Sequence, residues 1–175
     1  MIFTETPLAG AWIIDVDRKH DERGFFARTW SADEFRERGL NPHIVQCSIS
    51  FNAKRGTLRG MHYQSDPHGE TKLVRCTSGA IHDVIVDLRP DSPTYRRSFA
   101  AELSAENRRM FYIPRSFAHG FITLTDAAEV FYTMGNAYEP DAARGLRWND
   151  PALGIEWPLQ PAVIAQRDAD WPLIQ

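Results

Sequence analysis

Short segments in which apolar and polar residues alternate recur along most of the chain, and glycine or proline separates many of them. Alternation with a period of two is typical of β-strands that bury one face. The segments with this pattern are residues 11–16, 24–30, 44–50, 57–64, 71–77, 80–88, 95–103, 110–113, 120–124 and 129–134. Many strands at such short spacing predict an all-β antiparallel sandwich or barrel.

Helical features occur in one segment, residues 31–39. Ser31 followed by Glu34 three residues later is the pattern of a capping box, and Gly39 is a typical residue at a helix end. The pattern therefore predicts one short helix after the first two strands.

The remaining segments predict turns and loops within one domain. Residues 19–22 are polar and predict a turn, whereas the tryptophan- and proline-rich part from Ala143 onward predicts loops that wrap the barrel. The chain contains no linker and no internal repeat, so residues 1–175 are expected to form a single domain.

Potential catalytic side chains are concentrated in residues 56–78. The turn residues of the loop 65–69 predict that the strands on either side of it pair as a hairpin. Such a hairpin holds His62 close to Lys72, and an imidazole beside an ammonium suits proton transfer next to a developing negative charge. The alternative is a half-polar surface hairpin, since most charged residues on strands face water.

The spacing of Arg59 and His62 requires an irregularity in their strand. On a regular strand these two side chains point to opposite faces. Gly60 lies between them, and a β-bulge at this glycine brings both side chains to one face. We therefore predict a bulge at Gly60 if both residues belong to one site.

Three side chains are candidates for proton transfer, and each also has a structural interpretation. His62 is the leading general base, or a histidine satisfied in a polar network. Lys72 is an electrophile that faces a developing oxyanion, or a lysine whose stem covers apolar surface. Tyr132 is a proton donor, or a buried structural tyrosine. His119 fits a packed loop anchor, and His82 and Asp87 fit structural positions in their strand.

A metal site is the competing interpretation of the same region. His62, Gln64, Glu70 and His119 partly match the histidine and glutamate ligands of metal-binding cupin barrels. The spacing differs, however, and the amide of Gln64 is a poor ligand for a transition metal. Lys72 also repels a cation, so we expect no metal.

Composition and charge narrow the function classes. With 20 Lys and Arg against 23 Asp and Glu, the chain has a net charge of −3 and no basic field for a nucleic acid. No apolar run approaches the ~20 residues that span a bilayer, and residues 1–10 do not resemble a signal peptide. Cys47 and Cys76 lie in strand-like segments, where reduced, buried thiols of a cytoplasmic protein are expected.

Six motifs occur in an order that resembles the dTDP-4-dehydrorhamnose 3,5-epimerase family. They are residues 23–26 (RGFF), 58–64 (LRGMHYQ), 72–75 (KLVR), 83–89 (DVIVDLR), 114–121 (PRSFAHGF) and 148–151 (WNDP). The resemblance extends from about residue 8 to about residue 168. It implies an antiparallel jelly-roll barrel of the cupin type, without metal or redox cofactor, that forms homodimers.

The resemblance also implies roles for the catalytic residues. His62 matches the base, Tyr132 the proton donor and Asp168 the carboxylate that orients the histidine. Lys72 matches a residue that holds the substrate near its keto group. The implied reaction inverts C3, C5 or both in a nucleotide-linked 4-keto-6-deoxyhexose, because the carbonyl acidifies the adjacent C–H groups. Lys72 then stabilises the enolate oxygen in a water-poor site.

A second set of residues matches positions that bind the substrate and its nucleotide. The set consists of Arg23, Phe26, Arg28, Gln46, Ser48, Arg59, His119 and Tyr138. Tyr138 is implied to stack on the base. The apolar N-terminal strand and the resemblance together predict a homodimer in which Arg23 and Phe26 complete the neighbour's site.

Four positions depart from the family pattern. Arg28 stands where the family usually has Glu, Ser48 where it usually has Asn, Ala143 where it often has Glu, and Ala169 where it has a basic residue. These positions serve the nucleotide end of the substrate. The alternatives that remain are a 3-epimerase of another nucleotide sugar, for example one linked to CDP, and a non-catalytic or metal-binding cupin.

Overall fold

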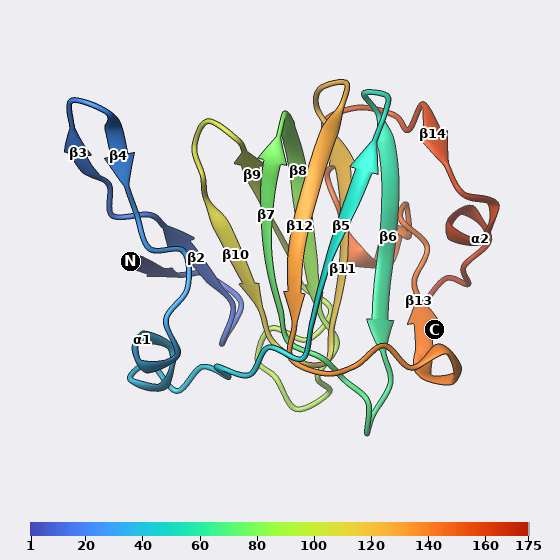
Figure 1. Cartoon of the computed structure of the whole chain (residues 1–175). Helices are drawn as coiled ribbons and strands as arrows, with labels where there is room; N and C mark the ends of the chain where they lie inside the picture. The colour runs from blue at the N-terminus through green and yellow to red at the C-terminus, as the bar shows by residue number, and fades with distance from the viewer. Residues whose placement is uncertain (175) are drawn as a thin grey trace.

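Two β-sheets packed face to face form the body of the protein in a computed structural model, which describes residues 1–174 (Figure 1). The first sheet contains, in spatial order, β1 (Ile2–Glu5), β2 (Trp12–Asp15), β10 (Met110–Ile113), β7 (Lys72–Ser78), β12 (Ala128–Met134) and β5 (Gln46–Asn52). The second contains β13 (Ala143–Gly145), β6 (Thr57–Gln64), β11 (Phe117–Thr123), β8 (Ala80–Asp87) and β9 (Ser98–Ser104). A short strand, β14 (Val163–Ile164), runs parallel to β6. The predicted all-β antiparallel jelly roll is confirmed.

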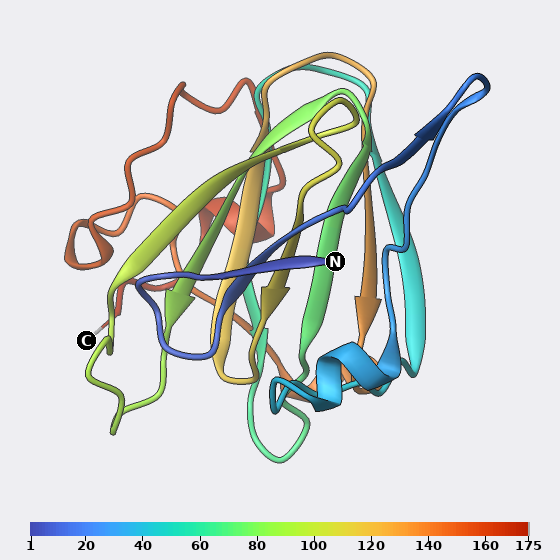
Figure 2. The same ribbon diagram turned by 90° about the vertical axis from the view of Figure 1, so that its left-hand side faces the viewer.

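A separate hairpin projects from the barrel near the N-terminus (Figures 1 and 2). Its strands are β3 (Lys19–Asp21) and β4 (Gly24–Phe26). The turn predicted for residues 19–22 is therefore wrong, and the strand predicted for residues 24–30 ends at Phe26. The first strand of the hairpin consists of three exposed polar residues, so no apolar alternation indicates it. The pattern also failed to indicate β1.

The predicted helix is present but shorter. Helix α1 (Ala32–Arg36) begins after Ser31, whose side chain makes no capping hydrogen bond. The predicted capping box is thus wrong, because the Glu34 carboxylate instead accepts hydrogen bonds from the N-terminal amino group and from Arg28. From Ala143 onward, the strands β13 and β14, the 3-10 turn Pro151–Leu153 and helix α2 (Gln166–Ala169) interrupt the predicted loops. Another 3-10 turn, Pro140–Ala142, directly precedes this part.

The hairpin predicted around the loop 65–69 does not form. β6 pairs with β11 and β13, whereas β7 pairs with β10 and β12, so the two strands belong to different sheets. Turn residues indicate that the chain reverses, but not which sheet receives the next strand. Since the sheets face each other, the side chains that the hairpin was expected to bring together still meet between them.

Apolar side chains from both sheets fill the space between them. They include Val74, Ile81, Ile85, Phe111 and Val130. β8 is buried on both faces because the C-terminal segment covers the outer face of its sheet. Burial on both faces explains the apolar run of residues 84–86 in this strand.

Loop packing explains two further differences from the sequence pattern. The strand predicted for residues 95–103 begins at Ser98, because Arg89, Ser92 and Thr94 hydrogen-bond to the buried Asp87 carboxylate and close a loop before it. Cys76 is buried as expected, but Cys47 is exposed on the edge strand β5. Within residues 1–174, no helix is long and apolar enough to span a bilayer.

Candidate active site

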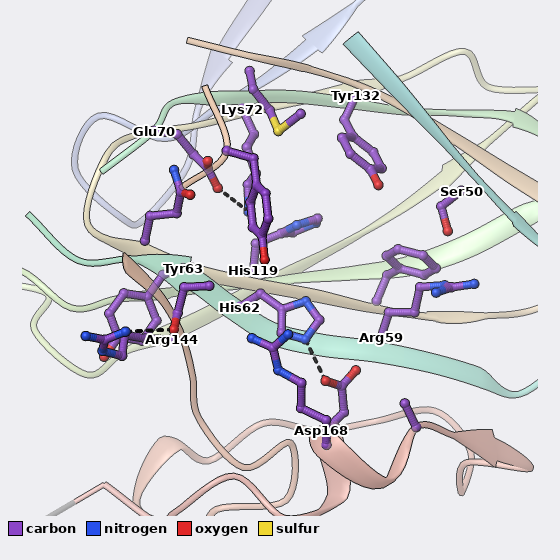
Figure 3. A pocket seen from close by; sticks show the side chains of 17 residues that line it. Ser50, Arg59, His62, Tyr63, Glu70, Lys72, His119, Tyr132, Arg144 and Asp168 are labelled. Carbon is purple, nitrogen blue, oxygen red and sulfur yellow. Dashed lines mark hydrogen bonds and ion pairs between the residues drawn. The ribbon is translucent and has the colours of Figure 1, made fainter. Parts of the chain in front are cut away.

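A cavity of about 400 Å³ opens between the two sheets (Figure 3). Strands β6, β7, β11 and β12 and helix α2 contribute most of its polar side chains. The side chains that bear on its chemistry are Arg59, His62, Glu70, Lys72, His119, Tyr132, Tyr138, Arg144, Arg167 and Asp168. All the residues predicted to catalyse the reaction therefore meet in one place.

The predicted bulge at Gly60 is confirmed. In the pairing of β6 with β11, His62 lies opposite His119 and Arg59 opposite Phe121, so two residues of β6 face one residue of β11. Gly60 has a φ of +138°, and a Cβ added to it would lie 2.5 Å from the Cα of Gly120. Only glycine fits this position. The bulge turns Arg59 and His62 toward the same cavity.

His62 and Asp168 form a hydrogen-bonded pair on one wall of the cavity. The Nε2 atom of His62 lies 2.7 Å from Oδ1 of Asp168, and Oδ2 accepts a hydrogen bond from the Gly60 N–H. Burial raises the pKa of Asp168. The hydrogen bond from His62 and the electrostatic attraction of its imidazole outweigh this effect, so the pKa of Asp168 lies below 3.8. An ionised Asp168 that accepts from Nε2 leaves Nδ1 as the basic nitrogen of a neutral imidazole.

Tyr132 lies on β12, across the cavity from His62 (Figure 3). Burial raises the pKa of its phenol above 10, the Arg59 charge lowers it, and the Glu70 carboxylate raises it further. The phenol therefore stays protonated near neutral pH. A protonated hydroxyl facing a base across a cavity is suited to donate a proton to the opposite face of a substrate.

Two further polar groups of the cavity are held by buried carboxylates. The Lys72 ammonium lies 3.0 Å from Oε1 of Glu70, and the Nε2 atom of His119 lies 2.8 Å from Oδ1 of Asp83. His119 lies within β11, so it is not the loop anchor that the sequence suggested. Sequence reasoning considered Glu70 only as a metal ligand and missed Asp83. A carboxylate directly before the apolar residues 84–86 was the available signal for Asp83.

Positive charges line the rest of the cavity. Arg59 donates from Nε to Oδ1 of Asn52 at 2.8 Å, which fixes its guanidinium. Arg144 and Arg167, which the sequence did not single out, line the cavity from β13 and α2 and are exposed. Guanidinium groups bind phosphate oxygens in a bidentate manner, so this arrangement suits a diphosphate.

The residues predicted to bind the nucleotide fall into two groups. Gln46 and Ser48 lie on β5 with their side chains 3.4 Å apart, and the backbone N–H of Tyr138 donates to Gln46. Tyr138 lines the cavity, whereas Gln46 and Ser48 do not. These three residues therefore lie side by side at the edge strand.

Arg23, Phe26 and Arg28 do not line the cavity. The side chain of Arg23 is 84% exposed and pairs with Asp21 on the hairpin, and Phe26 is 75% exposed. Arg28 pairs with Glu34 at 3.2 Å. A single chain thus does not bring these three predicted residues to the site.

The side chains considered for a metal are engaged elsewhere. The Gln64 amide donates to the carbonyl oxygens of His68 and Ala137 and accepts from the Glu139 N–H, and Glu70 pairs with Lys72. In the described part of the chain, no three His, Cys, Asp or Glu side chains are grouped to hold a metal ion.

The fold and the site define a jelly roll of the cupin type whose cavity holds a carboxylate-bound histidine opposite a tyrosine. The profile of the dTDP-4-dehydrorhamnose 3,5-epimerase family matches residues 5–175. The chain belongs to this family.

Individual relatives agree with this assignment. The chain is 44% identical over 173 residues to the dTDP-4-dehydrorhamnose 3,5-epimerase of Methanothermobacter thermautotrophicus, covering 97% of this chain and 92% of that protein. The crystal structure of the dTDP-4-dehydrorhamnose 3,5-epimerase from Elizabethkingia anophelis aligns with a TM-score of 0.96 at 39% identity. The alignment covers 99% of this chain and 96% of that chain. The Bacillus anthracis enzyme with TDP and PPi bound has a TM-score of 0.95 at 38% identity, with 99% of both chains covered.

Proposed function

We propose that this protein epimerises a nucleotide-diphosphate-linked 4-keto-6-deoxyhexose at C3, C5 or both, with dTDP-4-dehydrorhamnose as the first candidate substrate. The observation that carries this proposal is the placement of the His62–Asp168 pair and Tyr132 on opposite sides of one cavity that also contains Lys72. Base, proton donor and oxyanion-stabilising cation are the three groups that such a reaction needs.

Proton abstraction is assigned to His62. The keto group at C4 acidifies the C–H bonds at C3 and C5, and Nδ1 of His62 takes one of these protons. Asp168 holds the imidazole through Nε2 and stabilises the imidazolium that forms. The electron pair of the broken C–H bond moves into the enolate and its charge onto O4.

Stabilisation of the enolate is assigned to Lys72. Its side chain is 13% exposed, so a negative O4 near its ammonium is poorly screened by water. An oriented charge of this kind at a developing oxyanion is worth roughly 100-fold or more in rate.

Return of the proton is assigned to Tyr132. A proton donated from the face opposite His62 inverts the carbon, and a proton returned by His62 regenerates the substrate. Solvent then returns a proton to the phenolate and takes the abstracted proton from the His62 imidazolium, which restores both groups. No step in this sequence requires a change of oxidation state.

A homodimer completes the site in this proposal. On the other edge of the first sheet, the outer face of β5 and the residue before it expose Val45, Ile49 and Phe51 to 59%, 62% and 59%. A stripe of this size on an edge strand is typical of a protein interface. We assign Arg23 and Phe26 to the neighbour's nucleotide site, because neither reaches the cavity of its own chain.

Another pyrimidine nucleotide, such as CDP, is the second candidate for the carrier. Ala143 lines the cavity without a carboxylate, and Arg28 places a positive charge beside Glu34. A hydrogen-bond donor beside a thymine base would therefore have no carboxylate acceptor at these two positions. Stacking on Tyr138, in contrast, tolerates any base.

Incubation with candidate 4-keto sugars in D₂O tests the proposal. We expect deuterium to enter at C3, C5 or both, as followed by NMR. Wild-type protein that exchanges neither hydrogen in any dTDP- or CDP-linked 4-keto-6-deoxyhexose contradicts it.

A thermal shift assay distinguishes the proposed epimerase from a non-catalytic or metal-binding cupin. dTDP or CDP at 100 times its Kd should stabilise the fold by about 2.7 kcal/mol, whereas a chelator should leave the melting temperature unchanged. A melting temperature that falls with the chelator and does not respond to nucleotides favours the cupin alternative.

A further inference from the structure

Glu70 is a cavity carboxylate to which the proposed reaction gives no task. It lies in the loop between β6 and β7, two residues before Lys72. Its side chain is 7% exposed, and Oε1 lies 3.0 Å from the Lys72 ammonium (Figure 3). Two opposite charges are therefore paired at the wall of the cavity, largely out of contact with water.

The two charges depend on each other. Oε2 of Glu70 is buried and has no hydrogen-bond partner within residues 1–174. Each side chain has the other as its ion-pair partner in the described chain. Removal of either one leaves a buried, uncompensated charge, which is costly in a site of low dielectric. The pair therefore acts as a unit.

Lysine needs such a partner if its ammonium is to act at a fixed point. Its four-carbon stem is flexible, and an oxyanion-stabilising group must lie within about 0.5 Å of its working position. Two other polar side chains of the cavity are held in the same way. Asp168 holds His62, and Asp83 holds His119.

We propose that Glu70 is a positioning residue, whose buried carboxylate holds the Lys72 ammonium where it meets the oxygen that becomes negative during epimerisation. This inference rests on the proposed function, which supplies the epimerisation reaction. The positioning itself is inferred from the Glu70–Lys72 ion pair. Glu70 also balances the lysine charge while the cavity contains no substrate. When charge develops on O4, the ammonium is already in place and needs no reorientation.

The test is a double-mutant cycle with Glu70→Ala, Glu70→Gln, Lys72→Met and the combined Glu70→Ala/Lys72→Met variant. We expect Glu70→Ala to lower kcat for deuterium exchange by roughly 10- to 100-fold while KM changes by less than about threefold. Glu70→Gln should lose less, because its amide oxygen still accepts a hydrogen bond from Nζ. Glu102→Gln, on the exposed part of β9, is the matched control and should behave as wild type.

The cycle separates positioning from general damage to the fold. In the Lys72→Met background, Glu70→Ala should cause no further loss of kcat, because the residue that it positions is gone. The melting temperature should fall in each single variant and recover in the combined one, because the combined variant contains neither buried charge.

Two results overturn the proposal. One is a kcat of wild-type size in folded Glu70→Ala or, if that variant does not fold, in Glu70→Gln. The other is a loss from Glu70→Ala that is as large with methionine at position 72 as with lysine. Failure of the proposed function looks different, since wild-type protein would then show no exchange at all.

Discussion

The cavity and the β3–β4 hairpin place polar side chains in opposite ways. In the cavity, buried carboxylates hold the polar ends of His62, Lys72 and His119, as Asp168 holds His62 at 2.7 Å. On the hairpin, Arg23 and Phe26 are exposed, and the partner of Arg23 is its exposed neighbour Asp21. Under the proposed function, one chain thus supplies the catalytic groups, whereas the hairpin serves a neighbouring molecule. The experiments below test this contrast.

The largest effect is expected from His62→Ala. Removal of the base should lower exchange at C3 and C5 by about 1,000-fold, because general base catalysis contributes roughly 100- to 10,000-fold. Nucleotide affinity should change little, since Arg59 and Tyr138 remain. Isotope exchange and calorimetry measure the two properties separately.

His68→Ala is the control for this variant, because His68 is exposed in the loop before β7. It should exchange as wild type does. Exchange in His62→Ala above about a tenth of the wild-type rate would assign the base to another residue.

The hairpin variants should fail in binding rather than in chemistry. Arg23→Ala and Phe26→Ala should each weaken nucleotide binding by about tenfold, the loss of one contact worth about 1.4 kcal/mol. If the hairpin serves the neighbouring chain, a mixture of Arg23→Ala and His62→Ala should regain activity. In mixed dimers, one site combines His62 of the first chain with Arg23 of the second.

Activity of the mixture that equals the average of its components would mean that each chain binds the nucleotide alone. A fully active monomer in light scattering at micromolar concentration would contradict the dimer as well. Either result removes the contrast between cavity and hairpin.

The same contrast explains what could be predicted from the sequence. Strand β10 has the predicted bounds, and the bulge at Gly60 followed from the spacing of Arg59 and His62, because both depend on local alternation. The assignment of β6 and β7 to different sheets could not be predicted, because a turn signal carries no information about the receiving sheet.

Within the site, long-range packing limited the prediction. Alternation cannot show that Asp83 lies beneath His119, since the two residues are on different strands and meet only in the folded sheet. The site residues Arg144 and Arg167 come from the C-terminal part, which has no alternation. Asp168 became a candidate through the family resemblance alone, because α2 has four residues and a weak pattern.

Asp168 in the cavity and Asp21 on the hairpin both have lowered pKa values, so the pH dependence of stability can be compared between the two regions. Burial raises the pKa of Asp168 and the bond from His62 outweighs it, whereas the hydrogen bond from Arg23 lowers the pKa of the exposed Asp21. A carboxylate whose pKa is lower in the folded state stabilises the fold at pH values above its unfolded-state pKa. This stability is lost as the pH falls through the folded-state pKa.

We therefore expect Asp168→Asn to reduce the acid dependence of the unfolding free energy between about pH 5 and pH 2. Asp21→Asn should leave it unchanged within error, because water screens an exposed ion pair. Urea titrations across this range measure both. Equal effects of the two substitutions would show that burial does not separate the cavity from the hairpin.

The smallest effect is expected from Arg28, which follows the hairpin and whose side chain is 62% exposed beside Glu34. We expect Arg28→Glu to change the ratio of dTDP to CDP affinity by less than about tenfold, because a solvent-exposed charge contributes at most about 1 kcal/mol. Wild type should itself discriminate weakly against CDP, since Ala143 supplies no carboxylate to the cavity. Competition calorimetry with dTDP, UDP, CDP and GDP measures these ratios, and Arg36→Glu on α1 is the matched charge reversal. Strong, exclusive binding of dTDP that Arg28→Glu leaves unchanged would show that neither substitution governs the choice of nucleotide.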